Sequence, residues 1–244
     1  MKKYIGCSGF HYDHWKKDFY PEDLPKEKWL EYYADHFNTV EINNTFYNMP
    51  EVNDIKTWRD QTPDDFRFTV KANRYFTHMK KLKMDREFSD SLQDFQDTLH
   101  EFGDKLGCVL WQIPENLHKD VSKLDSFSEA LDMSMNHVLE FRHKSWFTKK
   151  IYNLMEDNEL SFCILSAPGD LPDDIITTSK TAYARFHGAK EWYEYHYSDK
   201  ELESWKKRLQ EPDGIDELYI YFNNDPNAWS VENATRFKSM LAGQ

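Results

Sequence analysis

Charged and amide side chains recur near the ends of short alternating segments in this sequence. Between Thr39 and Pro50, Glu41 and Asn43 share one face of an alternating segment whose other face is apolar. Carboxylates are suited to general acid and base catalysis, whereas arginine and lysine bind carboxylate or phosphate groups. Ten residues occupy such positions: Ser8, Glu41, Asn43, Lys71, Gln112, Glu140, Arg142, Arg185, His187 and Asn223. With His187 neutral, the set has three cations and two anions. It therefore predicts a slightly positive site for a small anionic ligand.

Two kinds of role follow from these residue types. Glu41 and Glu140 are the acid and base candidates, and His187, directly before Gly188, is the third candidate catalytic residue. The candidates for substrate binding are Ser8, Asn43, Lys71, Gln112, Arg142, Arg185 and Asn223. The alternative is structural, because the glutamates could instead pair with the lysine and arginines in a buried ion network that only fixes the interior.

The elements that would position these residues alternate between strand and helix. Strand candidates begin near Tyr4, Thr39, Phe66, Leu106, His137, Leu160, Ala182 and Glu217. Helical stripes of apolar residues occupy nearly all of the intervals, with predicted N-caps at Thr148 and Ser198, the latter opening a capping box with Glu201. This alternation predicts a parallel sheet covered by helices.

We predict that the sheet closes into a single (β/α)8 TIM-type barrel spanning residues 1–244. The first turn, Gly6-Cys-Ser-Gly9, lacks the glycine fingerprint of an open dinucleotide-binding sheet, and no linker or repeat divides the chain. The long, partly basic region from Lys71 to Ser89 predicts an elaborated loop after the third strand, over the mouth. Active sites of such barrels lie at the C-terminal ends of the strands, so the ten residues should ring one mouth.

Composition narrows the possible partners. The net charge is −12, from 31 basic and 43 acidic residues, which disfavours non-specific binding to nucleic acid or anionic membrane. One local basic segment, Lys80-Lys-Leu-Lys83 with Arg74 and Tyr75, keeps a non-catalytic module that binds nucleic acid or protein as an alternative. No apolar run approaches the ~18 residues of a membrane span.

The cysteines and the N-terminal residues indicate the cellular compartment in which the protein is expected. Cys7, Cys108 and Cys163 are widely spaced and lie in predicted strands, which indicates buried free thiols in a reducing compartment. The first residues lack the apolar region of a secretion signal. We therefore expect a cytoplasmic protein.

No sequence motif identifies a cofactor. The H-E-x-x-H, P-loop and G-x-S-x-G motifs are all missing from the sequence. A divalent metal held by Glu41, Glu140 and His187 is disfavoured because three cations are expected nearby. Aromatic residues beyond the strand ends would either stack on a sugar or base ring or pack the loops: Phe10, Trp15, Phe46, Tyr47, Tyr75, Trp146 and Trp192.

Several motifs together resemble those of one known family. They are Ile5-Gly-Cys-Ser-Gly9, Phe19-Tyr-Pro21, Thr39-Val-Glu-Ile-Asn43 with Thr45-Phe-Tyr47, Pro63-Asp-Asp-Phe-Arg-Phe68 with Lys71, Gln112-Ile-Pro114, Glu140-Phe-Arg-His143 with Ser145-Trp-Phe147, Arg185-Phe-His-Gly188 and Tyr221-Phe-Asn-Asn224. In this order they resemble the YecE-like family, also called domain of unknown function 72. The resemblance implies a TIM-barrel-like fold with a polar pocket at the strand ends, and no established reaction.

The sequence departs from that family's pattern at three positions. Phe10 stands where members often carry tryptophan, and Glu115 where a second proline is common. Ser166 stands where many members have an acidic residue, which weakens any metal site that would use it. Barrels of the family are distantly similar to xylose-isomerase and endonuclease-IV types, so a divalent-metal-dependent isomerase or nuclease is a further alternative, at the level of fold alone.

Overall fold

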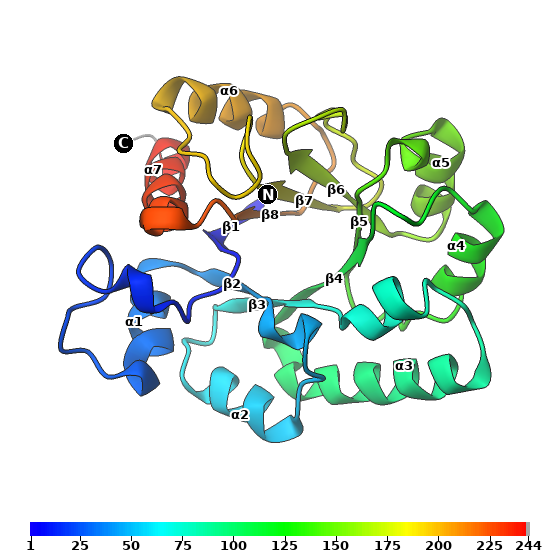
Figure 1. Cartoon of the computed structure of the whole chain (residues 1–244), viewed down its shortest axis with the longest axis horizontal. Coiled ribbons are helices and arrows are strands. Elements are labelled where there is room, and N and C mark those ends of the chain that lie inside the picture. The colour runs from blue at the N-terminus through cyan, green and yellow to red at the C-terminus, as the bar shows by residue number, and fades with distance from the viewer. Residues whose placement is uncertain (243–244) are drawn as a thin grey trace.

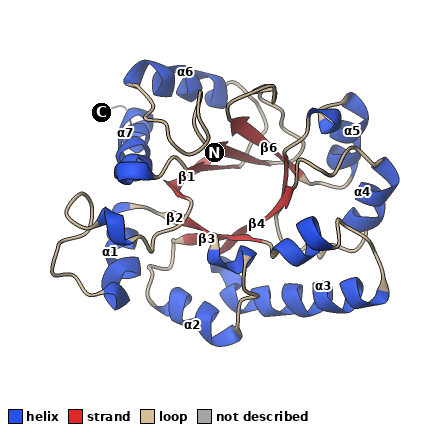
Figure 2. Ribbon diagram, viewed as in Figure 1, coloured by secondary structure: helices blue, strands red, loops and turns tan. Residues whose placement is uncertain are grey.

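A ring of parallel strands forms the centre of the molecule. The computed structural model describes residues 1–242, and its eight strands pair in the order β1-β8-β7-β6-β5-β4-β3-β2, every ladder being parallel. The strands are β1 (Lys2–Cys7), β2 (Thr39–Ile42), β3 (Arg67–Lys71), β4 (Leu106–Ile113), β5 (His137–Phe141), β6 (Ser161–Ser166), β7 (Thr181–Phe186) and β8 (Glu217–Phe222). Figures 1 and 2 show them curving round a common centre with the helices outside, which confirms the predicted barrel.

Helices on the outside cover the barrel. They are α1 (Trp29–His36), α2 (Val52–Asp60), α3 (Arg86–Leu99), α4 (Val121–Ser128), α5 (Lys149–Asp157), α6 (Asp199–Gln210) and α7 (Trp229–Ala242). The predicted capping box at the start of α6 is confirmed, because the Ser198 hydroxyl accepts from the Glu201 amide and the Glu201 carboxylate accepts from the Ser198 amide. Thr148 does precede α5, but its hydroxyl makes no capping bond. Within residues 1–242, no helix combines the length and apolar character that crossing a membrane requires.

Three connections differ from the sequence-based expectation. Helix α2 was not predicted, because only Ile55 of its residues is buried and one residue makes no apolar stripe. Between β6 and β7 the described chain forms no helix; two prolines lie in this segment, residues 167–180. The elaborated segment after β3 is shorter than expected, since α3 already begins at Arg86, and it contains a π-helical turn, Tyr75–Met79.

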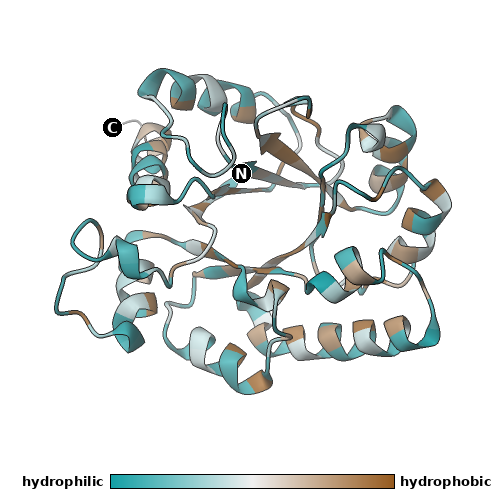
Figure 3. Cartoon of the chain, in the orientation of Figure 1, coloured by the Kyte–Doolittle hydropathy of each residue, from teal (hydrophilic) through white to brown (hydrophobic). Residues whose placement is uncertain are grey.

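The alternation of side chains along the strands creates two cores. One lies between the strands and the helices, and the other fills the barrel with Tyr4, Cys108, Leu110, Val138, Cys163, Leu165, Tyr183, Tyr219 and Tyr221. The three cysteines are buried and free, as expected. Figure 3 shows that the helices carry both hydrophilic and hydrophobic residues, as helices with one buried face do. The barrel interior is therefore a packed core and not a pore.

A tyrosine completes the ring where β1 meets β2. Within the described residues, the backbone pairing between these strands is one isolated bridge, Ser8 to Glu41. The Tyr33 hydroxyl, from α1, accepts a hydrogen bond from the Cys7 amide at 2.8 Å and donates one to the Thr39 carbonyl at 3.0 Å. A buried side chain thus joins the two strands in place of a regular ladder.

Two more residues fit this junction. The Asn38 carboxamide accepts from the Ile5 amide at 3.2 Å and donates to the Lys3 carbonyl at 2.9 Å. Gly6 permits the close approach, because a Cβ atom at this position would lie only 2.2 Å from the Thr39 carbonyl oxygen. The junction therefore requires glycine on one strand and polar side chains on the segment leading to the other.

Candidate functional site

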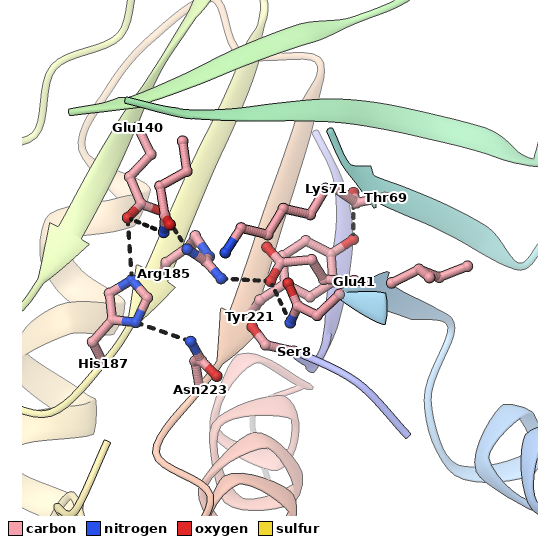
Figure 4. A network of polar contacts seen from close by, with 12 residues as sticks. Ser8, Glu41, Thr69, Lys71, Glu140, Arg185, His187, Tyr221 and Asn223 are labelled. Atoms are coloured by element: carbon pink, nitrogen blue, oxygen red, sulfur yellow. Dashed lines mark hydrogen bonds and ion pairs between the residues drawn. The ribbon is translucent and has the colours of Figure 1, made fainter. Parts of the chain in front are cut away.

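The ten residues predicted to share one mouth do lie together at the C-terminal ends of the strands. They come from or directly follow seven of the strands, and Figure 4 shows most of them converging on the barrel centre. Ser8 is bridged to Glu41 through the backbone, and the others are linked by hydrogen bonds or act on one another's charge. The structure therefore supports the expected placement of every predicted site residue; their roles stay predictions.

Arg185, on β7, lies at the centre of the group. Its Nη2 donates to Oε1 of Glu41 at 2.7 Å, and its Nη1 donates to Oε2 of Glu140. Burial alone would raise the pKa of Glu140, but Arg142 and Arg185 outweigh it and hold that pKa well below its ordinary value. The Glu140 carboxylate therefore stays ionised, as one arm of a buried ion network.

The remaining oxygen atoms of both carboxylates are also engaged. Oε2 of Glu41 accepts from the Tyr183 hydroxyl at 2.5 Å, and its Oε1 lies 3.3 Å from the Asn43 amide. Oε1 of Glu140 accepts from the Gln112 amide at 3.0 Å and from Nε of Arg142. The ion network weighed as an alternative in the sequence therefore exists, with arginines and not Lys71 as the partners of the glutamates.

His187 is held neutral inside this network. Its burial, with Arg142 and Arg185 nearby, lowers its pKa well below the usual range. Nε2 lies 3.0 Å from Nη2 of Arg142, and because a guanidinium can only donate, Nε2 is the acceptor. The ring proton is then on Nδ1, which lies 3.1 Å from Nδ2 of Asn223. That amide nitrogen is also a donor, so this pair forms a hydrogen bond only if the Asn223 carboxamide turns its oxygen toward the ring.

Lys71 differs from the other charged members. No ion pair or side-chain hydrogen bond of the described residues includes its amine, which lies 4.1 Å from the centre of the Phe46 ring. Burial, and then the charge of Arg185, lowers the pKa of Lys71 to about 7. Near neutral pH the amine is therefore divided between its charged and neutral forms.

The members of the site fall into two groups by exposure. The sealed group is Ser8, Glu41, Glu140, Arg185 and His187, none of which is more than 3% exposed. The accessible group, which is half-buried, is Asn43, Lys71, Gln112, Arg142 and Asn223. A ligand entering the mouth would therefore meet cations and amides, while both carboxylates lie beneath them.

Several buried polar atoms at the mouth have no hydrogen-bond partner. They include the Ser8 hydroxyl, the Asn43 carbonyl oxygen and Nε of Arg185. Such atoms usually have a partner, because leaving one unpaired costs about 1–3 kcal/mol. They supply two potential donors and an acceptor for a bound molecule.

Sequence reasoning missed two residues of the site. Tyr183 binds Glu41 and lies two positions before Arg185 on the same face of β7, so the strand period itself could have indicated it. His78 packs against Phe46 at 4.9 Å between ring centres, and its burial, with Lys71 and Arg142 nearby, lowers its pKa to about 4. Nothing in the sequence indicated His78, because its position depends on the π-helical turn.

The aromatic residues expected near the mouth divide between the two roles considered. Trp15 and Trp146 are fully buried and pack the loops. Trp192 is 37% exposed, and its ring lies 4.4 Å from the Arg142 guanidinium. Trp192 is therefore an aromatic surface that a ligand ring could contact.

Two cavities lie near or outside the mouth. One, of about 280 Å³, is lined by Glu115, Arg142, His143, Lys144, Pro168, Asp170, Leu171 and Trp192. A larger one, of about 890 Å³, lies against α7, outside the barrel, and its lining includes the Asp199–Arg236 pair. We favour the mouth as the functional site, because the convergent polar groups and lowered pKa values lie there.

The described residues offer no evident set of metal ligands. Within residues 1–242, no group of three or more His, Cys, Asp or Glu side chains is arranged to hold an ion. Oε1 of Glu41 and both oxygens of Glu140 already bind guanidinium groups. The residues present thus do not fit the divalent metal used by the distantly similar barrels.

Comparisons with known proteins agree on one family. The family described as "Protein of unknown function DUF72" matches residues 4–244. The Bacillus subtilis (strain 168) UPF0759 protein YunF is 27% identical over 98% of this chain and 94% of its own. The Escherichia coli (strain K12) UPF0759 protein YecE is 33% identical over 49% of this chain and 43% of its own.

Solved structures give the same result. The crystal structure of a DUF72 family protein from Thermotoga maritima MSB8 matches with a TM-score of 0.88 and 30% identity, covering 99% of this chain and 100% of that one. A DUF72 family protein from Enterococcus faecalis V583, at 20% identity and a TM-score of 0.85, has the same fold over 98% of this chain and 95% of its own. With the family match across nearly the whole sequence, these results establish that the chain belongs to the DUF72 family.

Proposed function

We propose that the chain is an enzyme that binds a small anionic metabolite, phosphorylated or carboxylated, at the C-terminal mouth of its barrel. One observation carries the proposal: the accessible group has two cations and three amides, and both glutamates of the network are sealed beneath it. An anion at the mouth would meet Lys71 and Arg142 without facing an exposed carboxylate of the network. Sugar phosphates and sugar acids belong to this class, with Trp192 as a surface for the sugar ring.

Lys71 is the group best suited to transfer a proton. Its pKa of about 7 lets it donate or accept a proton at neutral pH. The Glu140 carboxylate, held ionised by two arginines, is a weak base and no acid. In this proposal Glu140 and Glu41 fix Arg185, and the neutral His187 orients Arg142.

Ligand-induced stabilisation tests the proposal. Inorganic phosphate and glucose 6-phosphate should raise the Tm, because a ligand at about 100 times its Kd adds about 2.7 kcal/mol of stability. Glucose, which has no anionic group, should not raise it. Lys71→Met and Arg142→Met should abolish the shift. Arg236→Met, which removes an exposed arginine outside the mouth, should retain it. Equal shifts in all three variants would place the anion elsewhere and refute the proposal.

The basic segment considered for nucleic acid gives less support to a binding module. Lys80 pairs with Asp85 at 3.3 Å and with Glu87 at 2.7 Å, and Lys83 lies 3.9 Å from Asp85. Acidic neighbours thus offset much of the charge that phosphate contacts would need. The buried free thiols are consistent with the expected cytoplasmic location, which is part of the same proposal.

A further inference from the structure

We propose that Lys71 is a nucleophile, whose amine condenses with the carbonyl carbon of the substrate to form an imine. The substrate class would then be a small aldehyde or ketone that also carries a carboxylate or phosphate group. This inference rests on the proposed function, because the anionic group is what the accessible group of residues would bind. It adds a covalent step and a second functional group on the ligand.

The position of the amine suits attack on a carbonyl group. Figure 4 shows the Lys71 side chain running from the end of β3 toward the barrel centre, where the amine ends near Arg185. Lys71 is partly exposed, unlike Glu41, Glu140 and Arg185, so it is the charged member of the mouth after Arg142 that a ligand would approach. A lysine that served only to balance charge would lie against a carboxylate. The carboxylates of Glu41 and Glu140 are instead paired with Arg185 and Arg142, and Lys71 pairs with neither.

The surroundings of Lys71 favour its nucleophilic form. Only the neutral amine has a free electron pair, and the charge of Arg185 together with burial destabilises the ammonium form. The face of the Phe46 ring, whose centre lies 4.1 Å from the amine, favours the charged form through a cation–π contact, so burial and Arg185 act against it. A neutral amine thus exists near pH 7, where an exposed lysine is almost wholly protonated.

Two buried donors of the mouth have no partner and would serve the oxygen that the reaction creates. Ser8 is 3% exposed and Arg185 1%, and the Ser8 hydroxyl and Nε of Arg185 have no hydrogen-bond partner. Both can donate to a developing oxyanion. Arg142, already in the accessible group, would hold the anionic end of the substrate.

The condensation balances without another reactant. The nitrogen electron pair forms a C–N bond as the C=O π pair moves to oxygen, and one amine proton passes to that oxygen to give a carbinolamine. The C–O bond then breaks, the hydroxyl leaves as water with the second amine proton, and the nitrogen pair forms the C=N bond. One water is released for each imine, and hydrolysis reverses the step.

Reductive trapping with a small probe tests the proposal. Glyoxylate is an aldehyde with a carboxylate, and sodium cyanoborohydride reduces its imine to a stable carboxymethyl amine that peptide mass spectrometry locates. At pH 7 we expect Lys71 to be labelled at least about tenfold faster than the exposed Lys190 and Lys200, given the difference in neutral fraction. Its rate should level off above about pH 7, while rates at the exposed lysines continue to rise.

Controls separate this inference from the proposed function. Acetaldehyde lacks the anion and should label Lys71 more slowly than glyoxylate, and Lys71→Arg should retain the stabilisation by phosphate but lose the label. Phosphate stabilisation without preferential labelling of Lys71 would refute the imine and leave the anion site intact. Equal labelling by both aldehydes would support the nucleophile and count against the anion site. If Lys71 is not labelled and phosphate does not stabilise the protein, both the imine and the anion site are refuted.

Discussion

Arg185 and Glu41 form an ion pair across the barrel, with Nη2 of the arginine 2.7 Å from Oε1 of the glutamate. They lie 144 positions apart in the sequence, on β7 and β2, and neither side chain is exposed. The same guanidinium binds Glu140 on β5. Three strands are thus joined by one buried cation, which both supports the fold and leaves Lys71 without a carboxylate partner.

Replacing Arg185 with methionine should destabilise the protein by about 3–5 kcal/mol, because two buried carboxylates lose their shared cation. Urea unfolding measures the change. Arg236→Met is the matched control, since Arg236 pairs with Asp199 in an exposed ion pair and should contribute less than about 1 kcal/mol. Similar small losses for both variants would mean that the buried network does not support the fold.

Lys71→Met should stabilise the protein, and more so at low pH. The pKa of Lys71 is about 7 in the folded chain and about 10.4 when exposed, so between these values the unfolded chain binds more protons. Stability of the parent chain therefore rises with pH across this window. The gain from methionine should be largest below pH 7 and fade toward about pH 10.

Urea unfolding of both proteins at several pH values measures this difference. Lys190→Met, at an exposed position, is the control and should change stability little at any pH. A gain from Lys71→Met that is the same at every pH would contradict the lowered pKa.

Tyr33→Phe should cost about 1–3 kcal/mol, because it leaves the Cys7 amide and the Thr39 carbonyl without their shared hydroxyl. Amide exchange at Cys7 should also become faster. Tyr32→Phe removes a neighbouring hydroxyl that makes no hydrogen bond within residues 1–242, and it should be nearly neutral. If the two variants unfold at the same urea concentration, the hydroxyl is not what joins the strands.

Ser198→Ala should destabilise the protein by about 1 kcal/mol, because the capping box of α6 loses its hydroxyl. Thr148→Ala, at the matching position of α5, should cost less, since that hydroxyl is buried without a hydrogen bond. Thermal unfolding compares the two variants. A larger loss at Thr148 would overturn the assignment of the caps.

Much of the fold follows from period-2 and period-3.6 patterns. The alternation of Glu41 with Val40 and Ile42 placed β2 correctly, and the same reasoning collected all ten residues of the mouth. Helix α2 was not predicted, because a mostly exposed helix has no apolar stripe. The expectation of a helix in nearly every interval is confirmed, and the interval without one in the described chain lies between β6 and β7.

The ion pairs within the site could not be predicted from the sequence. The residue types predicted three cations and two anions in the site. They did not predict that Arg185 would form ion pairs with both glutamates and that Lys71 would pair with neither. Which charged groups pair depends on the distances between side chains on different strands of the closed barrel. Exposure is likewise a property of the assembled mouth, so the separation of a sealed from an accessible group could not be predicted.

Tyr33 links closure of the cylinder to the docking of one helix. Seven strand junctions have regular backbone ladders, whereas the one between β1 and β2 has a single bridge and is completed by the side chains of Asn38 and Tyr33. The Tyr33 hydroxyl is in place only when α1 has packed against the strands. During folding we therefore expect a curved open sheet to precede the closed ring. We expect the last backbone groups to be protected from solvent to be those that Tyr33 joins, the Cys7 amide and the Thr39 carbonyl.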